Sequence, residues 1–205
     1  SGIGIGTGIV GTAASNRYNA NNWSNLPDAT EYFEFTLTPN FGYRIDFSSL
    51  VYTSQVSNIT TAPTTFAVRS SVDGYTANIG SPVSGTTATI STIPLTAGAY
   101  QGITSAITFR IYGWGGTSAS STFSINDFVF NGNVLVAPPT ATFVKTNVSV
   151  CGGTNDGTIT VTPAGTGPFS YSWTGVTGSG NPATGVFPDP GNVSSLTGLP
   201  IGYYN

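Results

Sequence analysis

The sequence predicts an all-β protein made of two antiparallel β-sandwich domains. Gly and Pro interrupt the chain almost every ten residues, and no window carries apolar residues at helical spacing. Apolar and polar residues instead alternate with a period of two in several runs, which is typical of half-buried strands. A stiff pair, Pro138-Pro139, separates two sets of such runs and marks the expected domain boundary.

The first domain is expected to cover residues 1–137. In one run Phe33, Phe35 and Leu37 alternate with Glu34 and Thr36, so one side of that strand is apolar. Clusters of Gly, Pro, Asn and Ser separate the runs and indicate turns. The result is about eight strands, a number that suits an antiparallel sandwich. They are expected at residues 3–10, 33–37, 43–47, 50–54, 66–69, 87–93, 106–114 and 121–130.

The second domain is expected to follow Pro138-Pro139, a pair that neither a helix nor a central strand tolerates, and to cover residues 140–205. Residues 131–133, which read Asn-Gly-Asn, are expected to end the preceding strand. Asp156-Gly157 between alternating Thr and branched residues is a strong hairpin signal. Strands are therefore expected at residues 142–150, 158–162 and 169–173.

Three motifs follow one another in the second domain: residues 151–153 read Cys-Gly-Gly, residues 155–159 read Asn-Asp-Gly-Thr-Ile, and residues 171–173 read Tyr-Ser-Trp. In this order they resemble the SprB-type repeat of Bacteroidetes gliding-motility adhesins and other large surface proteins. The resemblance implies an immunoglobulin-like module of tandem arrays, mostly a spacer, in proteins that commonly leave the cell by type IX secretion. Trp173 is expected in its core. Such repeats close with one more strand after residues 202–204, so we expect the natural chain to continue and supply it. The alternatives are a strand from a neighbouring chain or from residues 3–10.

Four segments of the first domain carry a second resemblance. Residues 32–39 read Tyr-Phe-Glu-Phe-Thr-Leu-Thr-Pro and residues 107–113 read Ile-Thr-Phe-Arg-Ile-Tyr-Gly. Together with residues 66–75 and 125–128, they resemble a sandwich domain that recurs in secreted Bacteroidetes proteins. That domain is similar in outline to jelly-roll carbohydrate-binding modules. The resemblance therefore implies a jelly-roll-like sandwich for residues 1–137.

The composition excludes several classes of function. Charged residues make up 6% of the chain, its net charge is −3, and its few Lys and Arg are scattered singly. No basic stripe can neutralise a phosphate backbone, so nucleic acid is not an expected partner. The apolar runs are far shorter than the ~20 residues that a membrane-spanning helix needs. With no His and one Cys, a Cys/His zinc site and an internal disulfide are excluded. A start at Ser1 and the absence of Met fit a removed export signal, so we expect a secreted, extracellular or cell-surface protein.

We expect no enzyme and no catalytic residues. An acyl-transfer triad needs His or an equivalent base. Glu31 and Glu34 are three positions apart on an expected strand, so they point to opposite faces and do not flank one glycosidic bond. Gly6, Gly8 and Gly11 match a dinucleotide-binding motif by letter, but no helix is expected after them, so we interpret the segment as a Gly-rich edge strand.

Calcium is the one cofactor that the sequence suggests. Jelly-roll binding modules often hold a structural ion with Asp side chains and backbone carbonyls. Asp127, on the last expected strand of the first domain, is the first candidate ligand, and Asp28 is the second. The alternative is a plain surface Asp, because neither residue lies in EF-hand-like spacing.

The strand at residues 107–114 carries the candidate ligand-binding residues. Alternation places Arg110, Tyr112 and Trp114 on one face, and Arg69 on another strand is expected to join them. Such a surface suits a sugar, because aromatic rings stack on its C–H face while Arg bonds its hydroxyl groups. In the alternative interpretation the aromatic residues pack under a loop, and Arg110 pairs with Glu34 or Asp46.

These observations predict a non-catalytic adhesion or carbohydrate-binding module within a larger secreted protein. Its expected partner is a surface glycan or polysaccharide, or neighbouring modules or chains. The first alternative is a purely structural part of a stalk or filament that binds no small molecule. The second is a glycoside-processing enzyme, which would depend on the carboxylates alone.

Overall fold

The computed structural model describes residues 3–85, 88–149, 156–164, 169–174, 184–189 and 194–199. Almost all regular structure in these residues is β, which confirms the predicted all-β class. The helices found there are two single turns of 3₁₀ type, η1 (Ser71–Asp73) and η2 (Gly98–Tyr100). In this part of the chain, no helix has the length and apolar character to span a membrane. The chain divides into two compact units, Ser1–Leu135 and Val136–Asn205.

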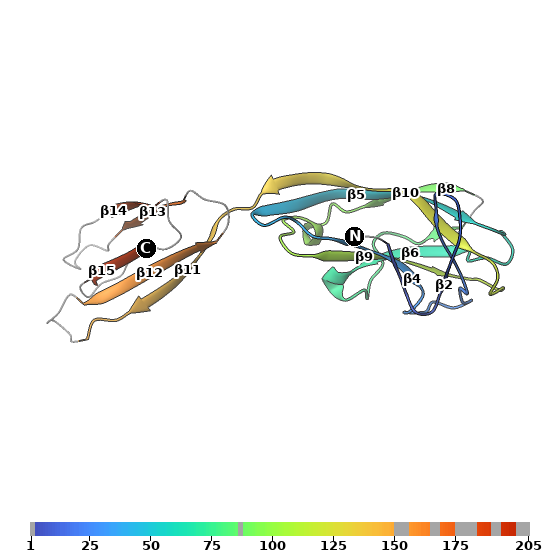
Figure 1. Cartoon of the computed structure of the whole chain (residues 1–205), viewed down its shortest axis with the longest axis horizontal. Helices are drawn as coiled ribbons and strands as arrows, with labels where there is room; N and C mark the ends of the chain where they lie inside the picture. The colour runs from blue at the N-terminus through green and yellow to red at the C-terminus, as the bar shows by residue number, and fades with distance from the viewer. Residues whose placement is uncertain are drawn as a thin grey trace. The chain divides into compact units, whose positions relative to one another are not determined.

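The first unit is a β-sandwich of two five-stranded sheets, here called sheet A and sheet B. Figure 1 shows β5, β8 and β10 in one layer and β4, β6 and β9 in the other. The spatial order in sheet A is β1-β4-β9-β6-β7, and in sheet B it is β2-β3-β10-β5-β8. Sheet A contains β1 (Gly4–Ile5), β4 (Tyr32–Leu37), β6 (Thr65–Ser70), β7 (Val83–Ser84) and β9 (Ile107–Trp114). Sheet B contains β2 (Val10–Thr12), β3 (Tyr18–Asn21), β5 (Tyr43–Val56), β8 (Thr89–Pro94) and β10 (Phe123–Val136).

The core of the first unit lies between the two sheets and is rich in aromatic rings. Phe66 of β6 stacks on Phe123 of β10, with ring centroids 3.9 Å apart. Phe109 of β9 contacts Phe47 of β5 edge-on, with centroids 5.6 Å apart. Trp23, just after β3, packs on Phe123 from another side. Because each ring removes a large apolar area from water, these contacts hold the two sheets together.

β5 and β10 differ from the strands that we predicted for these segments. β5 is one strand of 14 residues, where we predicted two strands at residues 43–47 and 50–54. β10 runs through residues 131–133, which we predicted as its end. Close packing explains the second difference, because a Cβ atom on Gly132 would lie 2.3 Å from the carbonyl oxygen of Asp46 on β5. The glycine therefore allows two strand backbones to approach each other and does not mark a turn.

The predicted strand at residues 3–10 is two short strands, β1 and β2, separated by a turn. They form the edges of sheets A and B, as expected for a Gly-rich edge segment. Gly6 lies against the backbone of Thr30, where an added Cβ atom would approach the carbonyl oxygen to 2.0 Å. The chain continues after Gly11 into β3, a strand that we did not predict. Since no helix follows the glycines, this segment lacks the geometry of a dinucleotide site.

The second unit arranges its described strands in two antiparallel sheets. One has the order β11-β12-β15, and the other pairs β13 with β14. β11 and β12 are antiparallel neighbours, as expected of a hairpin. Cys151 and residues 202–205 lie outside the described residues, and so does the side chain of Trp173, whose backbone pairs with Gly185. The bounds are β11 (Thr140–Thr146), β12 (Gly157–Ala164), β13 (Phe169–Thr174), β14 (Thr184–Asp189) and β15 (Ser194–Leu199).

Candidate functional site

The candidate ligand-binding residues lie on the outer face of sheet A, where β9 runs between β4 and β6. Along β9, Phe109 and Ile111 are fully buried, whereas Arg110 between them is half-buried. The strand register places Arg110 opposite Glu34 on β4 and opposite Arg69 on β6. Glu34, Arg110 and Arg69 therefore form one row of charged residues across three neighbouring strands.

The guanidinium group of Arg110 is held on three sides. Its Nε donates to Oε2 of Glu34 at 2.7 Å. Its carbon Cζ lies 3.9 Å from the ring centroid of Tyr32 and 3.8 Å from that of Tyr75, so both flat faces are covered by tyrosine rings. Burial by itself lowers the pKa of Arg110, but hydrogen bonds to Tyr112 and Glu34 raise it above its ordinary value. Arg110 is therefore a fixed positive charge, and only the part of its edge that Glu34 and Tyr112 do not use is open.

Tyr75 reaches Arg110 because of an unusual backbone conformation. It lies in the loop after β6, and both Gly74 and Tyr75 have left-handed backbones, with φ of 68° and 64°. Such a φ costs an aromatic residue about 1 kcal/mol or more. The backbone N–H of Tyr75 donates to the carbonyl oxygen of Ser70 at 2.9 Å, which folds the loop back over the sheet. The sequence does not reveal this role of Tyr75, since only the turn signal at Gly74 hints at the loop.

The contacts of Arg69 with the described residues are to neutral groups. Its Nε donates to Oδ1 of Asn78 at 2.8 Å, and its Nη1 donates to the carbonyl oxygen of Tyr75 at 3.2 Å. Its Cζ lies 4.9 Å from the ring centroid of Tyr112. Across the described part of the chain, the ion pairs are Arg110–Glu34 and Arg44–Asp46, and neither includes Arg69. We call the six residues of this surface the Arg–Tyr cluster: Tyr32, Glu34, Arg69, Tyr75, Arg110 and Tyr112.

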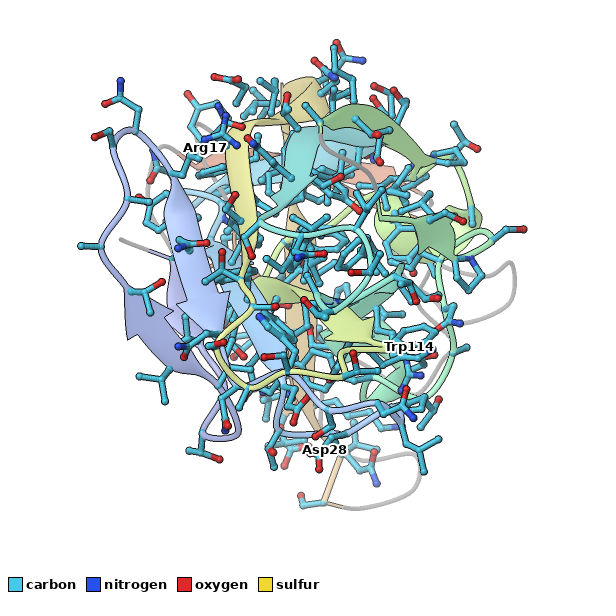
Figure 2. The ribbon with its side chains drawn as sticks, turned by 90° about the vertical axis from the view of Figure 1, so that its right-hand side faces the viewer. Arg17, Asp28 and Trp114 are labelled. Atoms are coloured by element: carbon cyan, nitrogen blue, oxygen red, sulfur yellow. The ribbon has the colours of Figure 1, made fainter. Side chains whose placement is uncertain are left out.

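The two aromatic candidates on β9 differ in how accessible they are. Tyr112 is 5% exposed, lies opposite Tyr32 and beneath Arg69, and packs as a buried part of the cluster. Trp114 is half-buried at the end of β9, opposite Thr65, and none of the ring contacts among the described residues involves it. Figure 2 shows Trp114 well apart from Arg17, which contacts Ser124 on β10 of sheet B.

The sequence left two interpretations open for Arg110, a sugar-binding face and an ion pair with an acid, and each agrees in part with the structure. Arg110 does pair with an acid, and the acid is Glu34, because Asp46 pairs with Arg44 at 3.5 Å. Tyr112 is buried, with Arg69 over its ring where that alternative expected a loop. The same contacts nevertheless bring Arg69, Arg110 and Tyr112 into one cluster, with Trp114 on the same face.

Two glutamates, Glu31 and Glu34, form hydrogen bonds that hold local structure. Glu31 is 4% exposed and accepts the backbone N–H of Ser24 at 2.7 Å as well as its hydroxyl group. It therefore fixes the loop before β4. Glu34 lies on the outer face of sheet A and binds Arg110. Each of these two carboxylates is already hydrogen-bonded within its own surroundings, which favours structural roles over general acid–base chemistry.

The two candidate calcium ligands, Asp127 and Asp28, lie in different surroundings. Asp28 accepts the backbone N–H and the hydroxyl group of Thr30 at 2.7 and 2.6 Å, and these hydrogen bonds lower its pKa. Asp127 is exposed on β10 and accepts Nδ2 of Asn126 at 2.8 Å. Among the residues that the structure describes, no group of three or more His, Cys, Asp or Glu side chains is placed to hold a metal ion. Calcium binding stays a prediction.

Asp127 has a backbone role that the sequence did not suggest. Its φ is 48°, in the left-handed region, in the middle of β10. Before it Phe123 and Ile125 are fully buried, and after it Phe128 and Phe130 pack on the core, so the inward spacing changes from two residues to three. A left-handed residue that shifts the alternation is typical of a β-bulge. The bulge turns the Asp127 carboxylate to solvent and both later phenylalanines inward.

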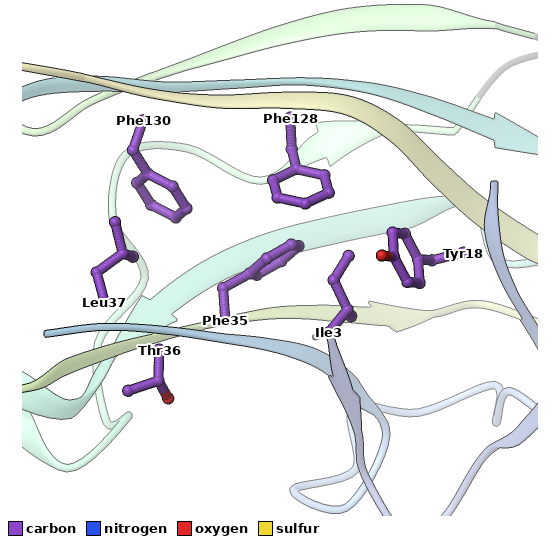
Figure 3. A pocket seen from close by; sticks show the side chains of 7 residues that line it. All are labelled: Ile3, Tyr18, Phe35, Thr36, Leu37, Phe128 and Phe130. Carbon is purple, nitrogen blue, oxygen red and sulfur yellow. The ribbon is translucent and has the colours of Figure 1, made fainter. Parts of the chain in front are cut away.

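β10 lines a cavity of about 170 Å³ whose other lining side chains are mostly apolar (Figure 3). Phe35 of β4 packs on Phe128, with centroids 4.7 Å apart, and Tyr18 contacts Phe128 edge-on at 6.0 Å. Figure 3 shows Phe35 and Leu37 on one side of β4 and Thr36 on the other. A sugar needs several polar partners, and of the side chains that line this cavity only those of Tyr18 and Thr36 carry a polar group. The cavity is therefore a poorer candidate for glycan binding than the outer face of sheet A.

The chain was compared with protein families, with characterised proteins and with solved structures. No family model matches it, and no curated protein or solved structure is significantly similar to it.

Proposed function

We propose that the chain is a non-catalytic adhesion or carbohydrate-binding module of a larger secreted, cell-surface protein. The outer face of sheet A is its binding surface. The observation that carries this proposal is the Arg–Tyr cluster with Trp114 beside it, in which two guanidinium groups and four aromatic rings share one sheet face.

The chemistry of this face suits a saccharide. Aromatic rings offer flat apolar surfaces to sugar C–H groups, and guanidinium groups donate several hydrogen bonds to sugar oxygens. Trp114 supplies the accessible ring, while Arg69 and the edge of Arg110 supply the donors. These residues stand on neighbouring strands of one sheet, and Glu34 fixes the orientation of Arg110 at 2.7 Å. A rigid site of this kind loses little conformational entropy when it binds.

The finer fold assignments also belong to this proposal. The first unit is a jelly roll: its strands from β3 to β10 pass between the sheets and give the orders β3-β10-β5-β8 and β4-β9-β6-β7, as two Greek keys folded over each other would. The second unit is an immunoglobulin-like spacer with two antiparallel sheets, supported by the order of its described strands. Neither unit needs a catalytic group or a cofactor for this role.

A structural role without any ligand is the second candidate, and one observation favours it. Arg110 already has Glu34 as a charged partner and tyrosine rings on both faces. A cluster so well satisfied can serve mainly to fasten the loop that carries Tyr75 onto sheet A. In that case the module would act as part of a stalk or filament.

A glycan array separates the two candidates. The proposal expects concentration-dependent binding of the whole chain to some glycans, lost when Trp114 is changed to Ala. The matched control is Phe41→Ala, because Phe41 is an aromatic residue that is 82% exposed in the turn between β4 and β5. Silence across the array, or equal loss in both variants, would favour the structural candidate.

A further inference from the structure

The charges in the row across sheet A do not balance. Glu34, Arg110 and Arg69 stand opposite one another on β4, β9 and β6. Residues directly opposite on antiparallel strands have Cα atoms about 5 Å apart, and like charges in such pairs repel. Glu34 compensates Arg110 through its 2.7 Å contact. Arg69, at the other end of the row, is left with one positive charge and no carboxylate partner among the described ion pairs.

The carboxylate of the adjoining loop does not turn to Arg69. Asp73 accepts the backbone N–H groups of Thr76 at 3.3 Å and Ala77 at 2.9 Å, and the bond to Ala77 is the main cause of its lowered pKa. Its hydrogen-bonding oxygens are thus used within its own loop. Among the described residues, no carboxylate therefore balances the positive charge of Arg69.

The free hydrogen-bond donors of Arg69 and Arg110 suit an oxyanion. Arg69 uses Nε and Nη1 for Asn78 and Tyr75, which leaves its Nη2 without a described partner. Arg110 has both flat faces covered by tyrosine rings, so a ligand can approach it only in the guanidinium plane, where Glu34 and Tyr112 already use some of its donors. In-plane approach is the geometry in which guanidinium groups bind carboxylate, sulfate or phosphate oxygens most strongly.

We infer that Arg69 and the edge of Arg110 bind the anionic group of an acidic polysaccharide, either a uronate carboxylate or a sulfate ester. This inference rests on the proposed function and names the ligand class of the same surface. A general attraction for polyanions does not explain such binding, because the chain carries a net charge of −3.

Matched polysaccharides test the inference by titration calorimetry on the whole chain. Polygalacturonate is compared with its fully methyl-esterified form, and dextran sulfate is compared with dextran. We expect at least one anionic polymer to bind and its neutral counterpart not to bind. The first comparison reports on a carboxylate and the second on a sulfate. Affinity should fall as salt rises, since ionic contacts to an exposed site are screened.

Three variants test whether Arg69 is responsible for the binding. Arg69→Gln should weaken binding of the anionic polymer about tenfold or more, the usual effect of losing a charged hydrogen-bond donor. Arg69→Lys should restore only part of it, because an ammonium group lacks the planar fork. Arg17→Gln is the charge-matched control: Arg17 contacts Ser124 on sheet B at 3.5 Å and has no described ion pair. Thermal melting of each variant verifies that it folds.

Each outcome decides the question. Equal binding of anionic and neutral polymers, still sensitive to Trp114→Ala, would overturn the acidic ligand and leave the proposed function standing. Equal loss in Arg69→Gln and Arg17→Gln would overturn the assignment to this row of charges. Absence of binding to both anionic polymers would overturn the inference as well, and the glycan array would then decide the proposed function separately.

Discussion

Arg69 and Arg110 stand directly opposite each other on β6 and β9, and the row that they form ends on β4 with a single carboxylate, Glu34. Two like charges in such a position repel, yet the fold keeps them together. Glu34 and the rings of Tyr32 and Tyr75 are the contacts that hold Arg110 in place. The stability of this face should therefore depend on one acid.

Changing Glu34 to Gln should lower the free energy of unfolding by about 1 kcal/mol, because it leaves the two arginines without a compensating charge. The loss should be larger at low salt than at high salt, since salt screens half-exposed charges. Urea denaturation at the two salt concentrations measures it. Adding Arg69→Gln to Glu34→Gln should recover part of the loss by removing the repulsion. An equal loss at both salt concentrations would show that packing, and not charge, is responsible.

Asp127 should tolerate glycine better than a branched residue. With φ at 48°, Asp127→Gly relieves an unfavourable backbone conformation and should leave stability unchanged or raise it by up to about 1 kcal/mol. Asp127→Val should lower it by about 2 kcal/mol, because a β-branched side chain is strained at positive φ. Chemical denaturation of both variants measures the difference. If Val is tolerated as well as Gly, β10 does not need the bulge that turns Phe128 and Phe130 inward.

Calcium binding at Asp127 or Asp28 has its own test. An ion that binds only the folded chain raises the melting temperature, so removing it with a chelator should lower that temperature. Asp127→Asn and Asp28→Asn then identify the ligand, because the variant that lacks it should no longer respond to calcium. A melting curve that is the same in chelator and in excess calcium would end this prediction.

The all-β class and the outward direction of Arg110 followed from alternation alone, because period two is a local property of the chain. Arg110, Tyr112 and Trp114 needed only the pleat of one strand to be placed on one face. The partners across the sheet were harder. That Arg69 stands opposite Arg110, and Glu34 beside it, depends on the register of three strands that are far apart in sequence.

The parts that sequence reasoning missed depend on unusual backbone geometry or on close packing. Tyr75 joins the cluster only because it adopts a left-handed backbone, which tyrosine rarely does, so its residue type gives no sign of it. The left-handed φ of Asp127 was not predicted either, because a side chain is visible in the sequence and a backbone angle is not. Residues 131–133 looked like a turn, because glycine serves both turns and close strand contacts.

The close contact at Gly132 gives a further prediction. A Cβ atom there would lie 2.3 Å from the carbonyl oxygen of Asp46 and 2.9 Å from Cα of Phe47. Gly132→Ala should therefore push β10 away from β5 and cost about 2 kcal/mol or more, as overpacking does. Gly98→Ala is the control, because nothing lies within 4 Å of a Cβ atom at that position. Thermal unfolding compares them, and equal melting temperatures would contradict the close packing described here.

Tyr52 predicts how stability changes at high pH. It is fully buried on β5, and burial raises its pKa to about 12, whereas tyrosine in an unfolded chain has a pKa of about 10. Between these two values the unfolded chain loses the phenol proton and the folded chain keeps it. The stabilising contribution is therefore complete below about pH 10 and disappears as the pH rises towards 12, a loss of about 3 kcal/mol.

Tyr52→Phe has no proton to lose at this position, so its free energy of unfolding should fall less steeply with pH than that of the original chain. Tyr43→Phe, a change at an exposed tyrosine on the same strand, should keep the original slope. Urea denaturation between pH 9 and pH 12 measures the three slopes, and identical slopes for Tyr52→Phe and the original chain would show that Tyr52 ionises as freely when folded as when unfolded.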